Sequence, residues 1–418
     1  MKRLIMLSLL LTSVFTLAAC GGNDDNDLHE GEVALTFWNI FTGPDGEVMR
    51  AMVSDFNEEY EGEIRVSTQT IPETDFYDVF NTSVPQGEGP DIAIMHMRRI
   101  AKNADLGLLN SFDGLIDEDT MGENYLPSAW QGGSFEGSRY GIPLDVHPIG
   151  LYYNKDILDD AGIEVPQTYD ELVAACDALE GVVDHCLPVS NTWPSQNLFV
   201  SSLFQHGGED LDENGEYPAF NTQEGYDALK VFHDLVYVDN ISIPNVTVDE
   251  DLTLFRQGNA AFHINGIWML NAIIDSGINF DTAPIATLFG DEQPATWADS
   301  HNFIMPLQQN VSEEKEEAIM TFIDYITANA MDWAEAGQFP ADLRILESDA
   351  FEALEYHNSF ADIDSITFTT TSPYLEDGFE PIFLRVTQAM RNENVNIQEL
   401  LDDAEDEGIE LVDEALGR

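Results

Sequence analysis

The stretch Gly141–Leu172 reads GIPLDVHPIGLYYNKDILDDAGIEVPQTYDEL. It starts as an apolar extended run that Pro143 and Pro148 interrupt, and it continues as a predicted strand over Gly150–Tyr153 and a short helix over Asn154–Ala161. A proline-interrupted strand that leads from one α/β segment into another is what we expect of a chain that crosses between two lobes. The stretch therefore predicts a hinge, provided that each side builds a lobe of its own.

The segment before this stretch has the alternation of strands and helices that is typical of a parallel sheet. The predicted order is a strand at Val33–Trp38, a helix that ends near Tyr60, a strand at Ile64–Ile71, a helix at Glu73–Val84 and a strand at Asp91–Met95. This β-α-β-α-β order implies an open sheet with right-handed crossovers, in which ligands bind beyond the carboxyl ends of the strands. The loop Trp38–Asp45 and His96 are then expected together at this edge of the sheet, at the entrance of the ligand site.

Length and composition agree with more than one lobe. The chain has 418 residues, of which 44% are hydrophobic, so it can bury sizeable cores. After the opening stretch, helices are predicted at Tyr169–Leu179 and Gly225–Val238, and a second extended passage at Trp297–Ile304 is taken as the return crossing. We therefore predict an α/β fold with two lobes, hinge crossings and a ligand cleft between the lobes.

The N-terminus has the features of a targeting segment. Lys2 and Arg3 precede an apolar run over Leu4–Leu17, which is too short to span a membrane as a stable helix. The run ends in Leu17-Ala18-Ala19-Cys20, which resembles the bacterial lipobox and implies cleavage before Cys20 and lipid attachment to its sulfur. The alternative is a plain signal peptide with an incidental cysteine. The polar residues that follow suit a flexible tether.

The charge balance is extreme, with 78 Asp and Glu against 16 Lys and Arg and a formal net charge of −62. Nucleic acid and anionic membrane surfaces would repel such a body, and phosphate-rich ligands would find few cationic partners. Because the acidic residues are spread over the whole length, we interpret them as a solvated surface adapted to high external salt or high pH.

Two cysteines besides Cys20 remain, Cys176 and Cys186. In an extracytoplasmic protein they could close a short disulfide, which would stabilise the fold by roughly 2–3 kcal/mol through loop entropy. Two unpaired buried thiols are the alternative, since spacing alone does not fix the geometry.

Several motifs, in this order, carry a resemblance over nearly all of Val33–Arg418. They are Gly141-Ile142-Pro143, Leu151–Asp156 with Ala161-Gly162, Pro166–Leu172, Phe255–Phe262 with Ile264–Trp268, and Gly337–Ala341. With them the chain resembles the extracellular solute-binding proteins of ABC importers, in particular the sugar-binding family 1 of the maltose-binding-protein type.

The resemblance implies a lipid-anchored receptor with two α/β lobes that capture a mono- or oligosaccharide by closing, and deliver it to a permease. It implies no catalysis, no cofactor, no metal and no nucleic acid, and we expect a monomer. The expected division is a signal peptide at 1–19, a tether at 20–32, lobe 1 at 33–144 and 303–328, crossings at 145–150 and 297–302, and lobe 2 at 151–296 and 329–418.

Aromatic, acidic and histidine side chains at the expected cleft are the candidate ligand-binding residues, because aromatic faces and hydrogen-bonding groups recognise sugars. Trp268 matches a stacking tryptophan of the family. His147 stands where maltose-binding protein has an acidic contact, and the loop Phe41–Gly46 also differs, so the resemblance implies a sugar ligand without identifying it as maltose. The full set is Trp38, Phe41, Asp45, His96, Asp145, His147, Trp193, Trp268, Trp297 and His301.

Some of these residues have a structural alternative. Trp38 ends a strand and could belong to the core, and Asp45 could serve to stabilise the N-terminus of a helix. His96 and His301 could be surface or core histidines with their own partners.

Three other readings of the sequence are alternatives to a sugar receptor: a hydrolase, a ferric-ion receptor and a calcium-binding loop. A secreted glycoside hydrolase is an alternative, although 78 carboxylates make pairs at glycosidase spacing uninformative. A ferric-ion receptor is suggested by Tyr152-Tyr153, but neighbouring residues of a strand point to opposite faces. The segment Asp210–Gly215 looks like the start of a calcium loop but lacks the glutamate at the twelfth position.

Overall fold

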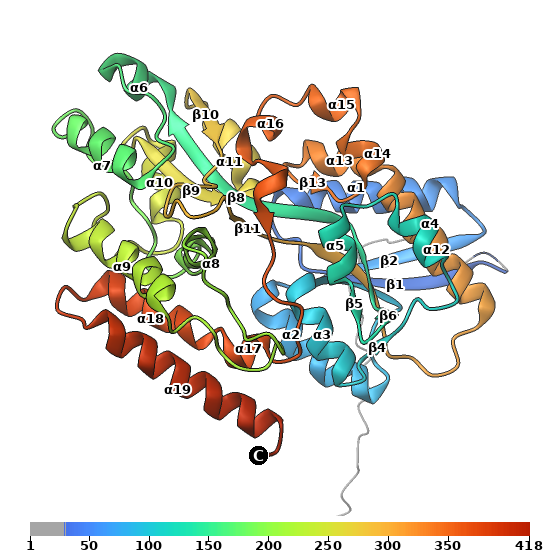
Figure 1. Ribbon diagram of the computed structural model, residues 1–418. Coiled ribbons are helices and arrows are strands. Elements are labelled where there is room, and N and C mark those ends of the chain that lie inside the picture. The colour runs from blue at the N-terminus through green and yellow to red at the C-terminus, as the bar shows by residue number, and fades with distance from the viewer. Residues whose placement is uncertain (1–28, 30) are drawn as a thin grey trace, which may run out of the picture.

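The computed structural model describes residue 29 and residues 31–418, so the predicted signal peptide, Cys20 and most of the tether lie outside the described residues. The described chain forms two α/β lobes, and the long strand β8 runs from one into the other (Figure 1). Among the described residues, no helix combines the length and apolarity needed to cross a membrane.

The first sheet contains the predicted β-α-β-α-β unit. Its strands, in order across the sheet, are β2 (Ile64–Thr70), β1 (Val33–Asn39), β3 (Ile92–His96), β12 (His301–Pro306) and β4 (Leu109–Asn110), and β7 (Gly141–Pro143) also pairs with β12. β1, β2 and β3 are parallel, whereas β12 returns antiparallel to β3. The first three strands therefore end at the same edge of the sheet, as the sequence predicts.

The second sheet is organised around one strand. Its strands are β10 (Phe280–Ala283), β8 (Asp145–Asn154), β11 (Thr296–Asp299) and β14 (Ile366–Thr367), with β9 (Phe262–Gly266) and β13 (Phe339–Pro340) also paired to β8. β8 begins at Asp145, not at Gly150 as predicted. Pro148 is tolerated because β8 changes neighbour there, from β11 to β9. A separate hairpin pairs β5 (Ser134–Phe135) with β6 (Ser138–Arg139).

Helices cover both sheets (Figure 1). From the N-terminus to β9 they are α1 (Pro44–Glu59), α2 (Glu73–Ser83), α3 (Met97–Asp105), α4 (Glu118–Gly122), α5 (Pro127–Gly132), α6 (Lys155–Ala161), α7 (Tyr169–Ala178), α8 (Ser195–Gln205), α9 (Gln223–Tyr237) and α10 (Glu250–Arg256). The later ones are α11 (Leu270–Ile274), α12 (Glu313–Ala328), α13 (Ala330–Glu335), α14 (Leu343–Leu346), α15 (Asp349–Glu352), α16 (His357–Phe360), α17 (Leu375–Gly378), α18 (Pro381–Arg391) and α19 (Ile397–Ala415). Short 3₁₀ helices are η1 (Val84–Gln86), η2 (Ile267–Met269) and η3 (Ile363–Ser365).

Two apolar cores are present among the described residues. The first surrounds the first sheet and extends to residues of the second sheet, among them Tyr152 of β8 and Phe280 of β10, whereas the second lies within the second lobe. In the first, Phe37 of β1 and Phe322 of α12 lie 5.3 Å apart between ring centroids, in an edge-on arrangement. In the second, Phe199 of α8 and Phe232 of α9 are fully buried against the residues of β8 and β9. Trp333, which was predicted for the second lobe, shares the core of the first sheet.

The disulfide left open by the sequence is formed. Cys176 of α7 and Cys186 are bonded, and their Cα atoms lie 5.4 Å apart. The closed loop is short, so the bond stabilises the fold by about 2–3 kcal/mol.

The chain changes sheet at two neighbouring points. β7 ends at Pro143 and β8 begins at Asp145, whereas β11 ends at Asp299 and β12 begins at His301. The backbone N–H of Leu144 donates to the carbonyl of His301 at 2.7 Å, which ties the two crossings together.

The carboxylate of Asp145 holds this region from inside. It is fully buried and accepts the backbone N–H of His301 at 3.0 Å and the indole N–H of Trp333 at 2.7 Å. The side chains of His147 and His301 also donate to it, at 3.0 Å and 2.8 Å. One carboxylate therefore connects β8, β12 and α13.

We predict that Asp145→Asn lowers the free energy of unfolding by about 3–5 kcal/mol, because an amide nitrogen would face donors in a buried site. Urea denaturation in high salt measures the difference. The exposed Asp160→Asn is the control and should change the stability by less than about 0.5 kcal/mol. Equal stability of the two variants would show that the Asp145 hydrogen bonds contribute little.

Candidate functional site

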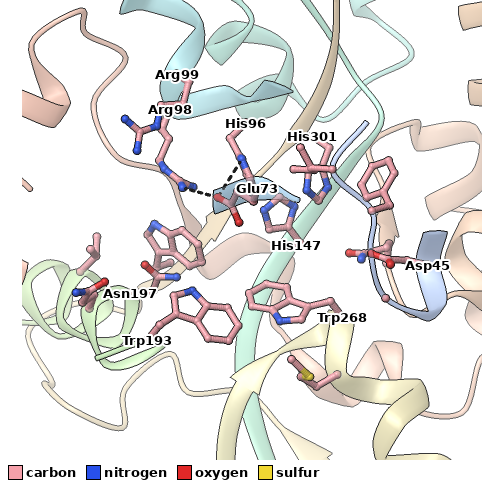
Figure 2. A pocket seen from close by; sticks show the side chains of 18 of the residues that line it. Asp45, Glu73, His96, Arg98, Arg99, His147, Trp193, Asn197, Trp268 and His301 are labelled. Carbon is pink, nitrogen blue, oxygen red and sulfur yellow. Dashed lines mark hydrogen bonds and ion pairs between the residues drawn. The ribbon is translucent and has the colours of Figure 1, made fainter. Parts of the chain in front are cut away.

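A cavity of about 480 Å³ lies between the two sheets (Figure 2). Its volume is in the range of small-molecule sites. The first lobe contributes the loop between β1 and α1, the end of β3 and the start of α3. The second contributes β8, the segment before α8, η2 and β11. The cavity therefore lies where the sequence expects a ligand, beyond the carboxyl ends of the first strands.

Most of the candidate residues meet there. Those that line the cavity are Phe41, Asp45, His96, His147, Trp193, Trp268, Trp297 and His301. They come from positions far apart in the chain, and the two lobes bring them together.

Two candidates do not line the cavity. Trp38 lies half-buried at the end of β1, and its side chain packs against the core of the first lobe, as the structural alternative proposed. Asp145 lies behind the cavity wall, fully buried, and acts on the site only through His147 and His301. Neither residue therefore belongs to the lining of this cavity.

Two tryptophans form an aromatic wall. Trp193 and Trp268 lie side by side in Figure 2, with ring centroids 5.6 Å apart and planes inclined by 33°. Both are half-buried and both line the cavity, so part of each indole is free to contact a ligand. Trp297 contributes less surface, because its side chain is buried in the second core.

The short sequence before Trp268 fixes the orientation of its ring. The indole folds back over Gly266, and a Cβ at that glycine would lie only 2.0 Å from the ring. Gly266 is therefore required by close packing rather than by an unusual backbone angle. A ring held in this way does not have to be ordered by the ligand, which favours binding.

Three histidines form the floor of the cavity. His96 ends β3, His147 lies on β8 and His301 begins β12, with ring centroids 4.2–5.7 Å apart. Figure 2 shows His96, His147 and His301 gathered above the two tryptophans. His147 also lies edge-on to Trp268, with ring centroids 5.6 Å apart.

The electrostatics of the floor depend on Asp145. Burial opposes its ionisation, but the neighbouring His301 and the hydrogen bonds from both histidines outweigh this and lower the pKa of Asp145. Burial opposes the charged form of His301 as well, yet Asp145 raises the pKa of His301 above its ordinary value. For His147, burial and the proximity of His301 dominate and lower the pKa. The pair of Asp145 and His301 is thus the charged element of the floor.

His96 has a separate environment. Burial and the neighbouring Arg98 lower the pKa of His96 well below its usual value. Its Nδ1 atom lies 2.7 Å from the hydroxyl of Tyr77 and 3.6 Å from a carboxylate oxygen of Glu73. The imidazole of His96 therefore offers a neutral hydrogen-bonding group to the cavity.

Asp45 lines the cavity from the first lobe (Figure 2). It lies in the first turn of α1, where a negative charge interacts favourably with the helix dipole, and it accepts the backbone N–H of Gly46 at 2.8 Å. Burial raises the pKa of Asp45. The capping role and a role in the cavity are thus compatible.

Several polar residues of the cavity were not predicted from the sequence, and Gln338 stands out among them. The others are Glu73, Arg98, Arg99, Gln196, Asn197, Thr369 and Glu380. Gln338 lines the cavity and is 1% exposed, yet neither atom of its side-chain amide has a partner among the described residues. An unpartnered buried amide is costly, and a polar ligand would satisfy it. Gln338 belongs to the motif Gly337–Ala341, which was noted only as a sign of the family.

The two arginines that line the cavity, Arg98 and Arg99, form ion pairs with acidic residues. Arg98 is paired with Asp299 and, at 3.3 Å, with Glu73, while Arg99 is paired with Glu376 and, at 3.4 Å, with Glu380. Figure 2 shows the contacts of Arg98 and His96 with Glu73. These arginines therefore help to organise the cavity wall, with much of their charge already balanced.

Solved structures with the same fold include two sugar-related receptors. The GacH receptor of Streptomyces glaucescens, solved alone and with acarbose, has a TM-score of 0.80 at 22% identity and covers 91% of this chain and 98% of its own. The maltose/maltodextrin-binding domain MalE of Bdellovibrio bacteriovorus, bound to maltotriose, has a TM-score of 0.77 at 19% identity, with 91% and 100% covered. At these identities the similarity establishes the fold.

Relatives are found in sequence as well. A maltotriose-binding protein of Pyrococcus abyssi is 25% identical over 256 residues, which is 61% of this chain and 54% of the relative. An arabinooligosaccharide-binding protein of Halalkalibacterium halodurans is 26% identical over 262 residues, 59% of this chain and 56% of the relative. The matched region thus spans about half the length of these relatives.

The family model for the bacterial extracellular solute-binding proteins matches residues 42–332. This region contains the first sheet except β1, most of the second sheet, both crossings between them and the cavity residues from Thr42 to His301. The chain belongs to the family of bacterial extracellular solute-binding proteins.

Proposed function

We propose that the protein captures a mono- or oligosaccharide in the cavity by closure of its two lobes and delivers it to the permease of an ABC transporter, without covalent chemistry. The observation that carries the proposal is the aromatic wall of Trp193 and Trp268 in the same cavity as an unpartnered buried amide, Gln338. The names of the relatives, which refer to maltotriose and arabinooligosaccharide, support the sugar class.

The chemistry of the cavity suits a sugar. Each pyranose or furanose ring has an apolar C–H face and a rim of hydroxyl groups. The indole faces of Trp193 and Trp268 would pack on the first, and Gln338, the histidines and Asp45 would hydrogen-bond the second. A cavity of about 480 Å³ leaves room for more than one sugar ring.

Closure of the lobes follows from where these groups are placed. His96 and Asp45 belong to the first lobe, and Trp193 and Trp268 to the second, so a ligand reaches all of them only when the lobes are together. A ligand shifts an open–closed equilibrium by its extra affinity for the closed form. Ion pairs between Lys102 of α3 and Asp377 of α17, 3.2 Å apart, also connect the lobes.

The cellular setting completes the proposal. Lipid attachment at Cys20 would hold the receptor outside the membrane, next to its permease, and the tether would leave the lobes free to move. The net charge of −62 is consistent with life in high salt or at high pH. We propose a monomer, because each cavity is complete within one chain.

The sugar class is tested by a thermal-shift screen of the mature protein in high salt against mono- and oligosaccharides. At least one sugar should raise the melting temperature, with an increase that grows with its concentration, because binding to the folded state alone stabilises it. The same sugar should be recovered uncleaved. Absence of a shift with every sugar, together with a shift from a non-sugar solute, would contradict the proposal.

The aromatic wall is tested by Trp268→Ala. The variant should bind the sugar found in the screen at least about tenfold more weakly, a loss of about 1.4 kcal/mol, because it removes one stacking face. Titration calorimetry measures the affinity. Trp38→Ala is the control, since Trp38 lies outside the cavity, and its affinity should remain that of the wild type. Equal affinities of all three proteins would remove Trp268 from the site.

A further inference from the structure

The three histidines at the cavity floor have the arrangement of a metal site. In the part of the chain that the structure describes, they form the group in which one ligand atom from each of three residues lies within 4.8 Å of the others. All three side chains are buried and line the cavity. Imidazole nitrogen is a preferred ligand of Zn²⁺, Cu²⁺ and Ni²⁺.

The Nδ1 atom of each ring is already engaged by an outer partner. Those of His147 and His301 lie 3.0 Å and 2.8 Å from oxygens of the Asp145 carboxylate, which also accepts two N–H groups, so both nitrogens act as donors to it. The Nδ1 of His96 lies 2.7 Å from the hydroxyl of Tyr77, which is able to accept as well. This leaves the three Nε2 atoms, which have no hydrogen-bond partner among the described residues, as ligand atoms.

A buried carboxylate behind ligating histidines is the usual outer shell of a zinc site. Such a partner fixes the ring orientation and makes the other nitrogen more basic. Asp145 serves two of the three rings at once and is itself held by Trp333 and by the backbone of His301. The outer shell is therefore rigid.

We propose that His96, His147 and His301 bind one divalent transition-metal ion, with Zn²⁺ as the preferred ion, through their Nε2 atoms at the floor of the cavity. Three protein ligands leave the fourth tetrahedral position open toward the cavity. Ligand nitrogens around such an ion lie roughly 3.4 Å apart, given Zn–N bonds of about 2.1 Å. In the structure one ring nitrogen from each of the three histidines lies within 4.8 Å of the other two, so binding requires the rings to move closer together.

The charges around the floor favour a cation. Asp45, Glu73 and Glu380 line the cavity with Arg98 and Arg99, and the two carboxylates behind the wall, Asp145 and Asp299, add negative charge. The acidic protein as a whole attracts cations from solution.

The resemblance implies no metal, and the three histidines are far apart in the chain. They stand 51 and 154 positions apart (147 − 96 and 301 − 147) and meet only because β3, β8 and β12 meet at the crossings. The proposal is independent of the sugar, since metal binding is measured in its absence.

The test is titration of the chelator-treated, full-length mature protein with ZnCl₂ in high salt, which screens surface carboxylates. One site per chain is expected. Loss of an outer partner typically weakens metal sites about 10–100-fold, so His96→Ala and His301→Ala, which lose a ligand itself, should each weaken binding about 100-fold or more. His185→Ala, outside the cavity, is the matched control and should bind as the wild type does.

A second readout needs no variant and so does not depend on the folding of one. Co²⁺ in place of Zn²⁺ should give the intense visible bands of a tetrahedral site, and Cu²⁺ should show coupling to nitrogen nuclei in its electron paramagnetic resonance spectrum. Absence of a stoichiometric site, oxygen-only coordination, or binding that His96→Ala and His301→Ala both leave unchanged would overturn the proposal.

Discussion

The buried carboxylate of Asp145 is the constraint on which the rest of the site depends. A charge without water must be compensated by hydrogen bonds, and four donors surround this one: two imidazoles, an indole and a backbone N–H. These donors come from β8, β12 and α13, so satisfying one carboxylate fixes the relative position of the two crossings. The same bonds set the direction of His147 and His301, and with it the floor of the cavity.

The walls follow from packing rather than from charge. Trp268 folds over Gly266, Trp193 lies beside it, and Gln338 lines the same cavity with an unpartnered amide. An organised apolar face beside an unsatisfied polar group is suited to a ligand that has both characters. Because the groups of the two lobes are separated by the crossings, the site is complete only when the lobes are together.

Much of this could be predicted from the sequence. Periodicity and proline positions predict the strands and helices of the first sheet and the crossing between the lobes. The residue types near the expected ligand site predict eight of the residues that line the cavity. Side-chain partners could not be predicted: nothing in the sequence shows that Asp145 would be enclosed by donors or that Gln338 would lack them. Trp38 was an ambiguous candidate, because its position at the end of a strand does not show whether the side chain points into the core or toward the ligand. The three histidines meet only through tertiary structure.

The most direct test of the account is a crystal structure of the protein with the sugar identified in solution. The account predicts a sugar ring packed on the face of Trp268, with a hydroxyl group within hydrogen-bond distance of the Gln338 amide and the two lobes closed around it. A sugar bound outside the cavity, or one in the cavity that contacts neither residue, would contradict it.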